Sequence, residues 1–276
     1  DVVLKDFRSQ QEFFRIKSSA YNWQQGAKAM WLDETRFIFN DMADGQLISK
    51  IIDTSKSFSE KKLPFPIYDC KEDWGVSLNF DRLTAFRPDY GYRSSGIEID
   101  PSNFNDADDG IYFVDLKLKS KKLIIDLDQL AKISQAKFSS NENWVNHLMI
   151  SPQGNRFMFL YRWIEGGLKK DALYVADISG ENLKCLNNEG MVSHCFWKDE
   201  ETIIGYMRTE KGGDHYYQIH INENHIQKMH LKTSGNMGDG HPSVFKNQMI
   251  YDTYPDRSGM KHLYLFDFEK KKQIEL

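Results

Sequence analysis

Three histidines recur in the second half of the chain at a constant interval. His147 and His194 are 47 residues apart, and so are His194 and His241. Imidazole nitrogens bind first-row divalent metals, and they move protons near neutral pH. If the fold gathers these three positions, the spacing predicts a metal or acid–base site.

Arginine follows the second strand of four predicted repeats, and two tyrosines lie close by in the sequence. The arginines are Arg87, Arg162, Arg208 and Arg257, and the tyrosines are Tyr92 and Tyr254. A guanidinium group pairs bidentately with a carboxylate, and a tyrosine ring stacks on a sugar face. The pattern favours an acidic oligosaccharide or another small anionic ligand. For any single arginine, a local salt bridge that closes a strand end is the competing interpretation.

The elements that must position these residues are short β-strands. Runs rich in aromatic and β-branched residues, such as Arg156–Tyr161, Thr202–Met207 and Gln248–Thr253, alternate with turn-forming clusters. This pattern is typical of an all-β sandwich, barrel or propeller. The 47-residue repeat, with about four strands in each unit, favours a β-propeller of four-stranded antiparallel blades.

We predict a single propeller domain over residues 1–276 with five clear blades. The blades span approximately 24–68, 74–127, 144–190, 191–237 and 238–276, and residues 1–20 form a partial blade or a tail. The second blade carries a long insertion, 87–110. Because a ring of blades must close, we expect six or seven blades in the full protein.

Propeller topology predicts where the polar residues gather. The first strand of each blade lines the central channel, and its start opens on the same face as the connection between the second and third strands. On this face we expect a nearby histidine to act as the base, and Arg162 and Arg208 to act as clamps on carboxylates. The expected substrate-binding residues are Gln25, Arg87, Tyr92, His215, Tyr254 and Arg257. For each blade-start histidine, a structural hydrogen bond to a neighbouring blade is the alternative.

Two short helices and one acidic loop are also expected. Helical patterns occur at 126–138 and 7–14. Asp106, Asp108 and Asp109 lie close together, but the run lacks the glycine and the distal glutamate of a calcium-binding loop. We therefore expect a solvated acidic loop.

Composition restricts the classes of partner and the compartment. The chain has 36 Lys and Arg against 40 Asp and Glu, a formal charge of −4, which argues against nucleic-acid binding. No apolar run approaches the roughly 18–20 residues that cross a bilayer. Three widely spaced cysteines form no disulfide framework and favour a reducing, cytoplasmic location. The chain begins at Asp1, so a fragment or processed product is expected, and a protein partner stays open.

Three segments resemble the blade starts of the oligogalacturonate lyases and of WD-repeat-like bacterial propellers. They are Val192-Ser193-His194-Cys195-Phe196-Trp197, Gly240-His241-Pro242-Ser243 and Asn146-His147. The likeness covers roughly 146–276. It implies a catalytic histidine at His194 and a manganese-binding histidine at His241, so manganese is the expected cofactor.

The sequence departs from the lyase pattern at several metal positions. Asp239 stands where the lyases have a second metal histidine, and Asn236 where they have a glutamine. Oxygen ligands would favour a harder ion. The lyases have a further metal histidine, and in this sequence His215 is the only candidate to replace it. The expected metal residues are His147, Asp239 and His241.

These features predict a propeller that binds an acidic, uronate-containing oligosaccharide, with metal-assisted β-elimination as the candidate reaction. The sequence leaves open whether the protein is an enzyme. The rival is a non-catalytic scaffold or ligand sensor in bacterial polysaccharide metabolism. A hydrolase ranks last because no clear pair of catalytic carboxylates is present.

Overall fold

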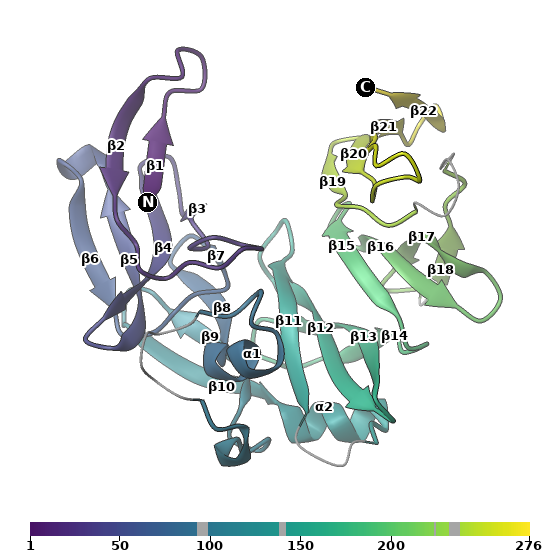
Figure 1. Cartoon of the computed structure of the whole chain (residues 1–276), viewed down its shortest axis with the longest axis horizontal. Helices are drawn as coiled ribbons and strands as arrows, with labels where there is room; N and C mark the ends of the chain where they lie inside the picture. The colour runs from purple at the N-terminus through teal and green to yellow at the C-terminus, as the bar shows by residue number, and fades with distance from the viewer. Residues whose placement is uncertain (93–98, 138–141, 224, 232–237) are drawn as a thin grey trace. The chain divides into compact units, whose positions relative to one another are not determined.

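A computed structural model describes residues 1–92, 99–137, 142–223, 225–231 and 238–276. Strands dominate the structure (Figure 1). The chain forms two compact units, Asp1–Ile150 and Ser151–Leu276. Asn236 lies outside the described residues. Among the described residues, no helix is long and apolar enough to cross a membrane.

The first unit contains a two-stranded hairpin, two complete four-stranded sheets and one further strand. The hairpin joins β1 (Val2–Lys5) to β2 (Glu12–Ile16). The first sheet consists of β3 (Met30–Trp31), β4 (Arg36–Ala43), β5 (Gln46–Asp53) and β6 (Ser59–Leu63). The second consists of β7 (Asp69–Lys71), β8 (Trp74–Leu78), β9 (Gly110–Asp115) and β10 (Ser120–Asp126). The last strand is β11 (Asn143–Ile150).

The second unit continues the same pattern. Three strands follow β11 in its sheet: β12 (Arg156–Glu165), β13 (Leu168–Asp177) and β14 (Lys184–Asn187). The next sheet contains β15 (Val192–Trp197), β16 (Thr202–Thr209), β17 (Gly213–His220) and β18 (His225–Lys228). The last contains β19 (Ser243–Phe245), β20 (Gln248–Asp252), β21 (Leu263–Asp267) and β22 (Lys272–Glu275). Strands adjacent in sequence are adjacent in each four-stranded sheet, as in propeller blades. The predicted all-β fold of four-stranded antiparallel blades is confirmed.

The inner strands are apolar on both faces because each blade packs on both sides. In β4, Phe37 and Phe39 join a core with Ile52, whereas Ile38 packs with Ile51 in a second core on the opposite face. A strand buried on both faces has a nearly continuous apolar sequence instead of strict alternation. This explains the aromatic runs in the sequence.

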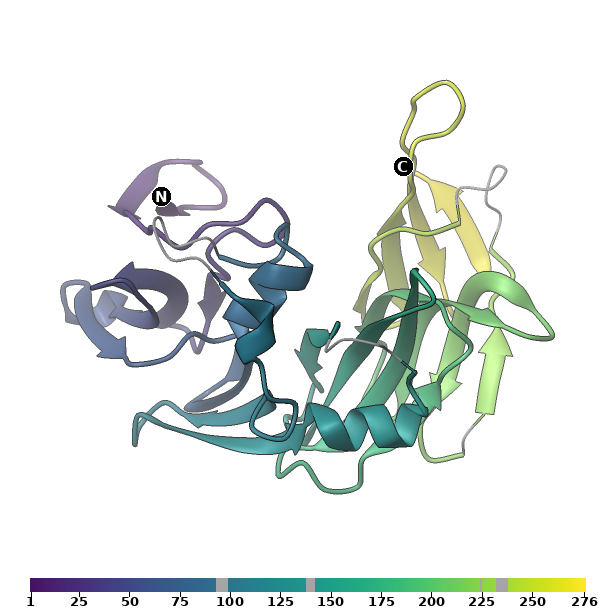
Figure 2. The same cartoon turned by 60° about the horizontal axis from the view of Figure 1, so that its bottom comes forward.

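Helices are few and short in the described part of the chain. They are α1 (Phe80–Phe86), α2 (Leu127–Ser134) and the 3₁₀ turns η1 (Thr54–Lys56) and η2 (Pro101–Asn103). Figure 2 shows α1 and α2 outside the sheets. Of the helix expected at 126–138, the structure has the part Leu127–Ser134, and the Asp126 carboxylate caps it by accepting from the Gln129 N–H.

The helix expected at 7–14 is wrong, because this segment belongs to the β1–β2 hairpin. Phe14 stacks on Phe58 and meets Phe37 edge-on, so its ring packs against the first sheet. Tertiary packing thus overrides a short helical pattern, which is marginal in isolation.

The expectation of a solvated acidic loop is wrong for two of its three aspartates. Arg82 of α1 is 2% exposed and lies within ion-pair distance of Asp106 (2.9 Å) and Asp109 (2.5 Å). Asp109 is buried, whereas Asp108 stays exposed. An arginine from the preceding helix therefore neutralises the loop.

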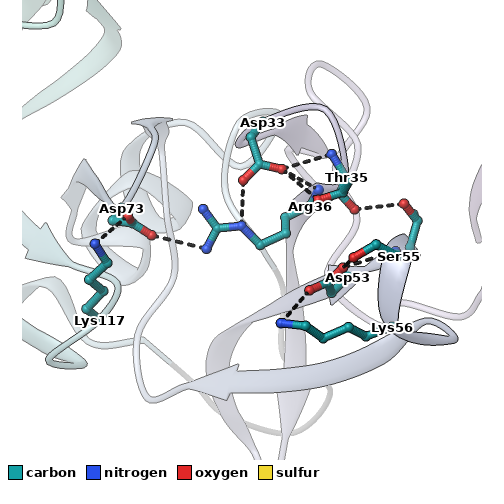
Figure 3. Close-up of polar contacts among 9 residues, drawn as sticks. Asp33, Thr35, Arg36, Asp53, Ser55, Lys56, Asp73 and Lys117 are labelled. Carbon is teal, nitrogen blue, oxygen red and sulfur yellow. Dashed lines mark hydrogen bonds and ion pairs between the residues drawn. The ribbon is translucent and has the colours of Figure 1, made fainter.

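Figure 3 shows an ion-pair network that joins the two complete sheets of the first unit. Arg36, at the start of β4, donates from Nε to Asp33 (2.6 Å) and from Nη1 to Asp73 (3.1 Å), which precedes β8. Lys117 pairs with the other oxygen of Asp73 at 2.7 Å. The backbone N–H of Thr35 and the Arg36 guanidinium lower the pKa of Asp33. The network fixes the ends of neighbouring blades to each other.

We expect replacement of Arg36 with methionine to lower the free energy of unfolding by about 1 kcal/mol, because the pairs are partly exposed but joined in a network. Urea unfolding would measure this. Lys56→Met is the matched control, since Lys56 pairs with Asp53 of its own sheet (Figure 3) and is largely exposed. Equal effects of the two substitutions would contradict a bridging role for Arg36.

Candidate functional site

Two of the predicted histidines meet in the second unit. His194 lies in β15 and His241 precedes β19, and their ring centroids are 4.0 Å apart with a 44° angle between the planes. The side chain of His194 is 15% exposed and that of His241 is 65% exposed. Equivalent positions in consecutive blades thus bring two imidazoles into contact at the surface of the unit.

Asp239 binds two consecutive residues of β15. Its Oδ1 lies 3.1 Å from His194 Nδ1, and its Oδ2 accepts a 2.6 Å hydrogen bond from the Ser193 hydroxyl. Consecutive strand residues normally point to opposite faces. The β15–β16 register shifts between Val192 and Cys195, and this irregularity allows both side chains to reach one carboxylate.

His241 has a carboxylate partner of its own. Asp252, the last residue of β20, accepts from the His241 backbone N–H at 2.6 Å and lies 3.0 Å from its Nδ1. Burial alone would raise the pKa of Asp252, but these hydrogen bonds from His241 outweigh it and lower the pKa. A Cβ added to Gly240 would lie 1.8 Å from the Asp252 carbonyl oxygen, so only glycine permits this approach.

The segment that carries Asp239 and His241 is held on both sides. The Tyr216 hydroxyl donates to the Gly240 carbonyl at 2.9 Å, and the Tyr254 N–H donates to the Asp239 carbonyl at 3.2 Å. Cys195 follows His194 directly, but burial raises the pKa of its thiol to about 12. Cys195 therefore stays a thiol at neutral pH, which argues against a cysteine nucleophile.

The arginines predicted to bind carboxylates already contact carboxylates of the chain. Arg87 binds Asp89 through two nitrogens (3.1 and 2.8 Å), and Arg208 binds Asp214 in the same way (2.7 and 2.9 Å). Arg162 is buried, and its Nε lies 3.2 Å from Asp171. These three contacts match the local salt bridges that the sequence left as the alternative, and a role in ligand binding stays a prediction.

The remaining candidates of the second unit lie at its surface. His215 is exposed on β17 beside Asp214, and burial together with the charge of Lys228 lowers its pKa despite that carboxylate. Tyr254 is 53% exposed. Arg257 is exposed in the turn after β20. The predicted roles of these three side chains stay predictions.

A separate group of predicted residues meets in the first unit. The Tyr68 hydroxyl accepts from Gln25 Nε2 at 3.0 Å and from the His147 backbone N–H at 2.9 Å. The His147 ring meets the Tyr90 ring edge-on at 5.3 Å, and Arg87 lies over the same tyrosine ring. Gln25, Tyr68 and His147 are therefore neighbours in this unit.

His147 itself has an unusual backbone. Its φ is +52° although the residue lies within β11. A positive φ of this kind costs a non-glycine residue about 1–3 kcal/mol. His147 belongs to the first unit and the other two histidines to the second. The convergence of all three histidines stays a prediction.

The proposed metal residues do not form a ready coordination site in the described part of the chain. No group of three or more His, Cys, Asp or Glu side chains is arranged there to hold a metal ion. Both Asp239 oxygens accept hydrogen bonds, and His241 Nδ1 is engaged by Asp252. The donor set that these residues present therefore does not fit the expected manganese ion.

The arrangement is suited to proton transfer. A carboxylate that accepts from Nδ1–H fixes the imidazole tautomer and leaves the lone pair on Nε2, as in catalytic Asp–His pairs. Two such pairs lie side by side, so one ring can accept a proton while the other donates one. The sequence reasoning found Asp239 but missed Ser193 and Asp252. The signal for Asp252 was its place at the end of β20, opposite the segment that contains His241.

The loop that contains Tyr254 and Arg257 is tied down by a pH-sensitive contact. His262 Nδ1 lies 2.5 Å from Glu275, and its Nε2 lies 3.5 Å from Asp256. The hydrogen bond that the ring donates to Glu275, followed by its hydrogen bond to Asp256, raises the pKa of His262 above its usual 6.5.

A group whose pKa is raised by folding stabilises the folded state at pH values below its pKa in the unfolded chain. This contribution disappears as the pH rises through the pKa of the group in the folded protein. We therefore expect Glu275→Gln to destabilise the protein more at about pH 5.5 than at about pH 8.5. Urea unfolding at both pH values checks this. An equal loss at both would show that the imidazolium does not contribute.

Comparisons with known proteins identify the fold. No family model matches the chain, and no curated protein matches it in sequence. Among solved structures, an oligogalacturonate lyase in complex with manganese has a TM-score of 0.59 at 14% identity, covering 99% of this chain and 69% of that one. The β-propeller domain of the trilobed protease from Pyrococcus furiosus has a TM-score of 0.57 at 10% identity, covering 99% and 73%.

A second oligogalacturonate lyase, from Vibrio parahaemolyticus, has a TM-score of 0.53 at 13% identity. That match covers 90% of this chain but only 63% of the lyase. The match to the tricorn protease covers 90% of this chain and only 26% of that protein. At these identities the likeness shows the fold alone. The chain is therefore a β-propeller protein whose solved neighbours include oligogalacturonate lyases.

Proposed function

We propose that this propeller binds an acidic, uronate-containing oligosaccharide and cleaves it by β-elimination at the paired histidines. One observation carries the proposal: two Asp–His pairs whose imidazole rings are 4.0 Å apart. The structural likeness to oligogalacturonate lyases supports the choice of substrate class.

In the proposed reaction, His194 Nε2 takes the proton from the carbon next to the uronate carboxylate. The electron pair of that C–H bond forms a carbon–carbon double bond, and the glycosidic C–O bond at the next carbon breaks. Protonated His241 gives a proton to the departing oxygen, so the proton count balances. Asp239 orients His194, and Asp252 stabilises the imidazolium of His241. Arg208, which is half exposed, remains the candidate for binding a carboxylate of the substrate.

The described residues do not present a donor set that fits the expected manganese ion, so the proposed reaction includes no step on a metal. Each step above uses side chains of the chain alone.

The experiment is an ultraviolet absorbance assay of the unmodified protein. With trigalacturonate we expect absorbance from the unsaturated product, which hydrolysis does not make. Galactotriose is the matched neutral substrate, and it should give no signal because it lacks the carboxylate that makes the adjacent proton acidic. Parallel reactions with added Mn²⁺ and with EDTA measure the metal requirement. No product under any of these conditions would contradict the proposed reaction.

The rival function is a non-catalytic scaffold or sensor. The contacts of Arg87 and Arg208 with aspartates of the chain favour it, because engaged guanidinium groups must exchange partners to bind a ligand. Binding of trigalacturonate measured by calorimetry without product formation would support a sensor. Absence of both would support a scaffold.

A further inference from the structure

The first unit contains a cavity of about 410 Å³, and among its lining residues Tyr92 belongs to the predicted substrate-binding set. The cavity lies between the two complete sheets, beside the β4–β5 hairpin and the start of α1, which Figure 1 labels. This volume is within the range of roughly 300–1,000 Å³ that small-molecule sites occupy. By topology, the cavity opens at the end where β4 and β8 finish, opposite the ion-pair network of Figure 3.

Aromatic residues are among those that line it. Phe80 and Tyr92 are buried with ring centroids 5.0 Å apart, and Tyr112 of β9 lines the cavity as well. The start of α1 is fixed because the Asn79 carboxamide caps it and also donates to Asp109. The wall is therefore held in place before any ligand arrives, which lowers the entropic cost of binding.

Three long polar side chains surround the opening. They are Gln46, Asp81 and Lys121, all exposed. Within the described residues, none of the three makes a side-chain hydrogen bond or an ion pair, although Lys121 Nζ lies 4.7 Å from the centre of the Tyr112 ring. They can thus offer both donors and acceptors to a ligand without first breaking a hydrogen bond or an ion pair.

We infer that this cavity is a second saccharide site, which takes a one- or two-ring sugar bearing a carboxylate. Aromatic walls pack against the apolar face of a sugar ring, and the polar rim bonds to its hydroxyl groups. Lys121 supplies the positive charge for the carboxylate. The inference rests on the proposed function for the class of ligand, and it adds a separate place where an acidic product or chain end is held.

The test is a titration of digalacturonate followed by ¹H–¹⁵N NMR, using the His194→Ala variant so that no turnover occurs. We expect shifts at amides around Gln46, Asp81 and Tyr112. Adding Lys121→Met should weaken this binding about tenfold, the usual effect of losing a charged hydrogen bond. Lys122→Met is the matched control, because its side chain points to the other face of β10.

Three results would overturn the inference: shifts confined to the second unit, equal effects of the two lysine substitutions, or equal binding of a neutral disaccharide. The absorbance assay separates this site from the reaction. Amide shifts around the cavity without unsaturated product would refute the elimination and support the site. Unsaturated product without amide shifts around the cavity would refute the site and support the elimination.

Discussion

Replacing Arg82 with methionine should lower the free energy of unfolding by about 3–5 kcal/mol, the range for breaking a buried ion pair from one side. Arg82 is 2% exposed and contacts Asp106, Asp109 and the carbonyl of Asn143. Its removal leaves the buried carboxylate of Asp109 without a countercharge. Burial already raises the pKa of Asp109 despite the opposing charge of Arg82.

The loss should depend on pH. Without Arg82 the pKa of Asp109 rises further, so protonation relieves the penalty and the destabilisation shrinks as the pH falls. Urea unfolding at about pH 5 and about pH 8 measures both effects. Arg15→Met is the control, since Arg15 forms ion pairs only at the exposed β1–β2 hairpin. A loss near zero, or one that grows in acid, would contradict the proposed role of Arg82.

The second large effect concerns the reaction. His194→Ala should reduce formation of unsaturated product by about 10²–10⁴-fold, the usual contribution of a general base. Asp239→Asn should reduce it by a similar order, because an amide no longer selects the Nδ1–H tautomer. Initial rates in the absorbance assay measure both.

The controls separate chemistry from folding. His225→Ala removes an exposed imidazole from β18 and should leave the rate unchanged. His194→Ala should change the free energy of unfolding by no more than about 1–2 kcal/mol, since Asp239 keeps its hydrogen bond from Ser193. A collapse of stability with His194→Ala would indicate a structural histidine instead.

The fold was predictable because its signal is local and repeated. Aromatic strand runs and the 47-residue spacing of the histidines reflect blades that bury both faces, and they identify four-stranded sheets without any long-range information. The contact between His194 and His241 follows from the same repetition. The helix expected at 7–14 was wrong because Phe14 packs on Phe37 and Phe58, which a local pattern does not contain.

The details of the site depend on contacts that spacing does not encode. Ser193 reaches Asp239 only because the β15–β16 register shifts, and His241 reaches Asp252 only because Gly240 permits a close approach. Arg82 joins partners 27 and 61 residues away, so the acidic loop looked solvated in the sequence. Arg162 and Arg208 lie within β12 and β16 instead of after them, and they contact aspartates of their own hairpins, a choice that the sequence left open.

The tautomer of the His194 ring tests the central claim most directly. We predict that ¹⁵N NMR of the neutral ring shows the proton on Nδ1, held by Asp239, and that the Nε2 resonance shifts when galacturonate is added. Galacturonate has no glycosidic bond to cleave, so the spectrum reports binding alone. A proton on Nε2, or an Nε2 resonance that does not change when galacturonate is added, would contradict the proposal that His194 is the base.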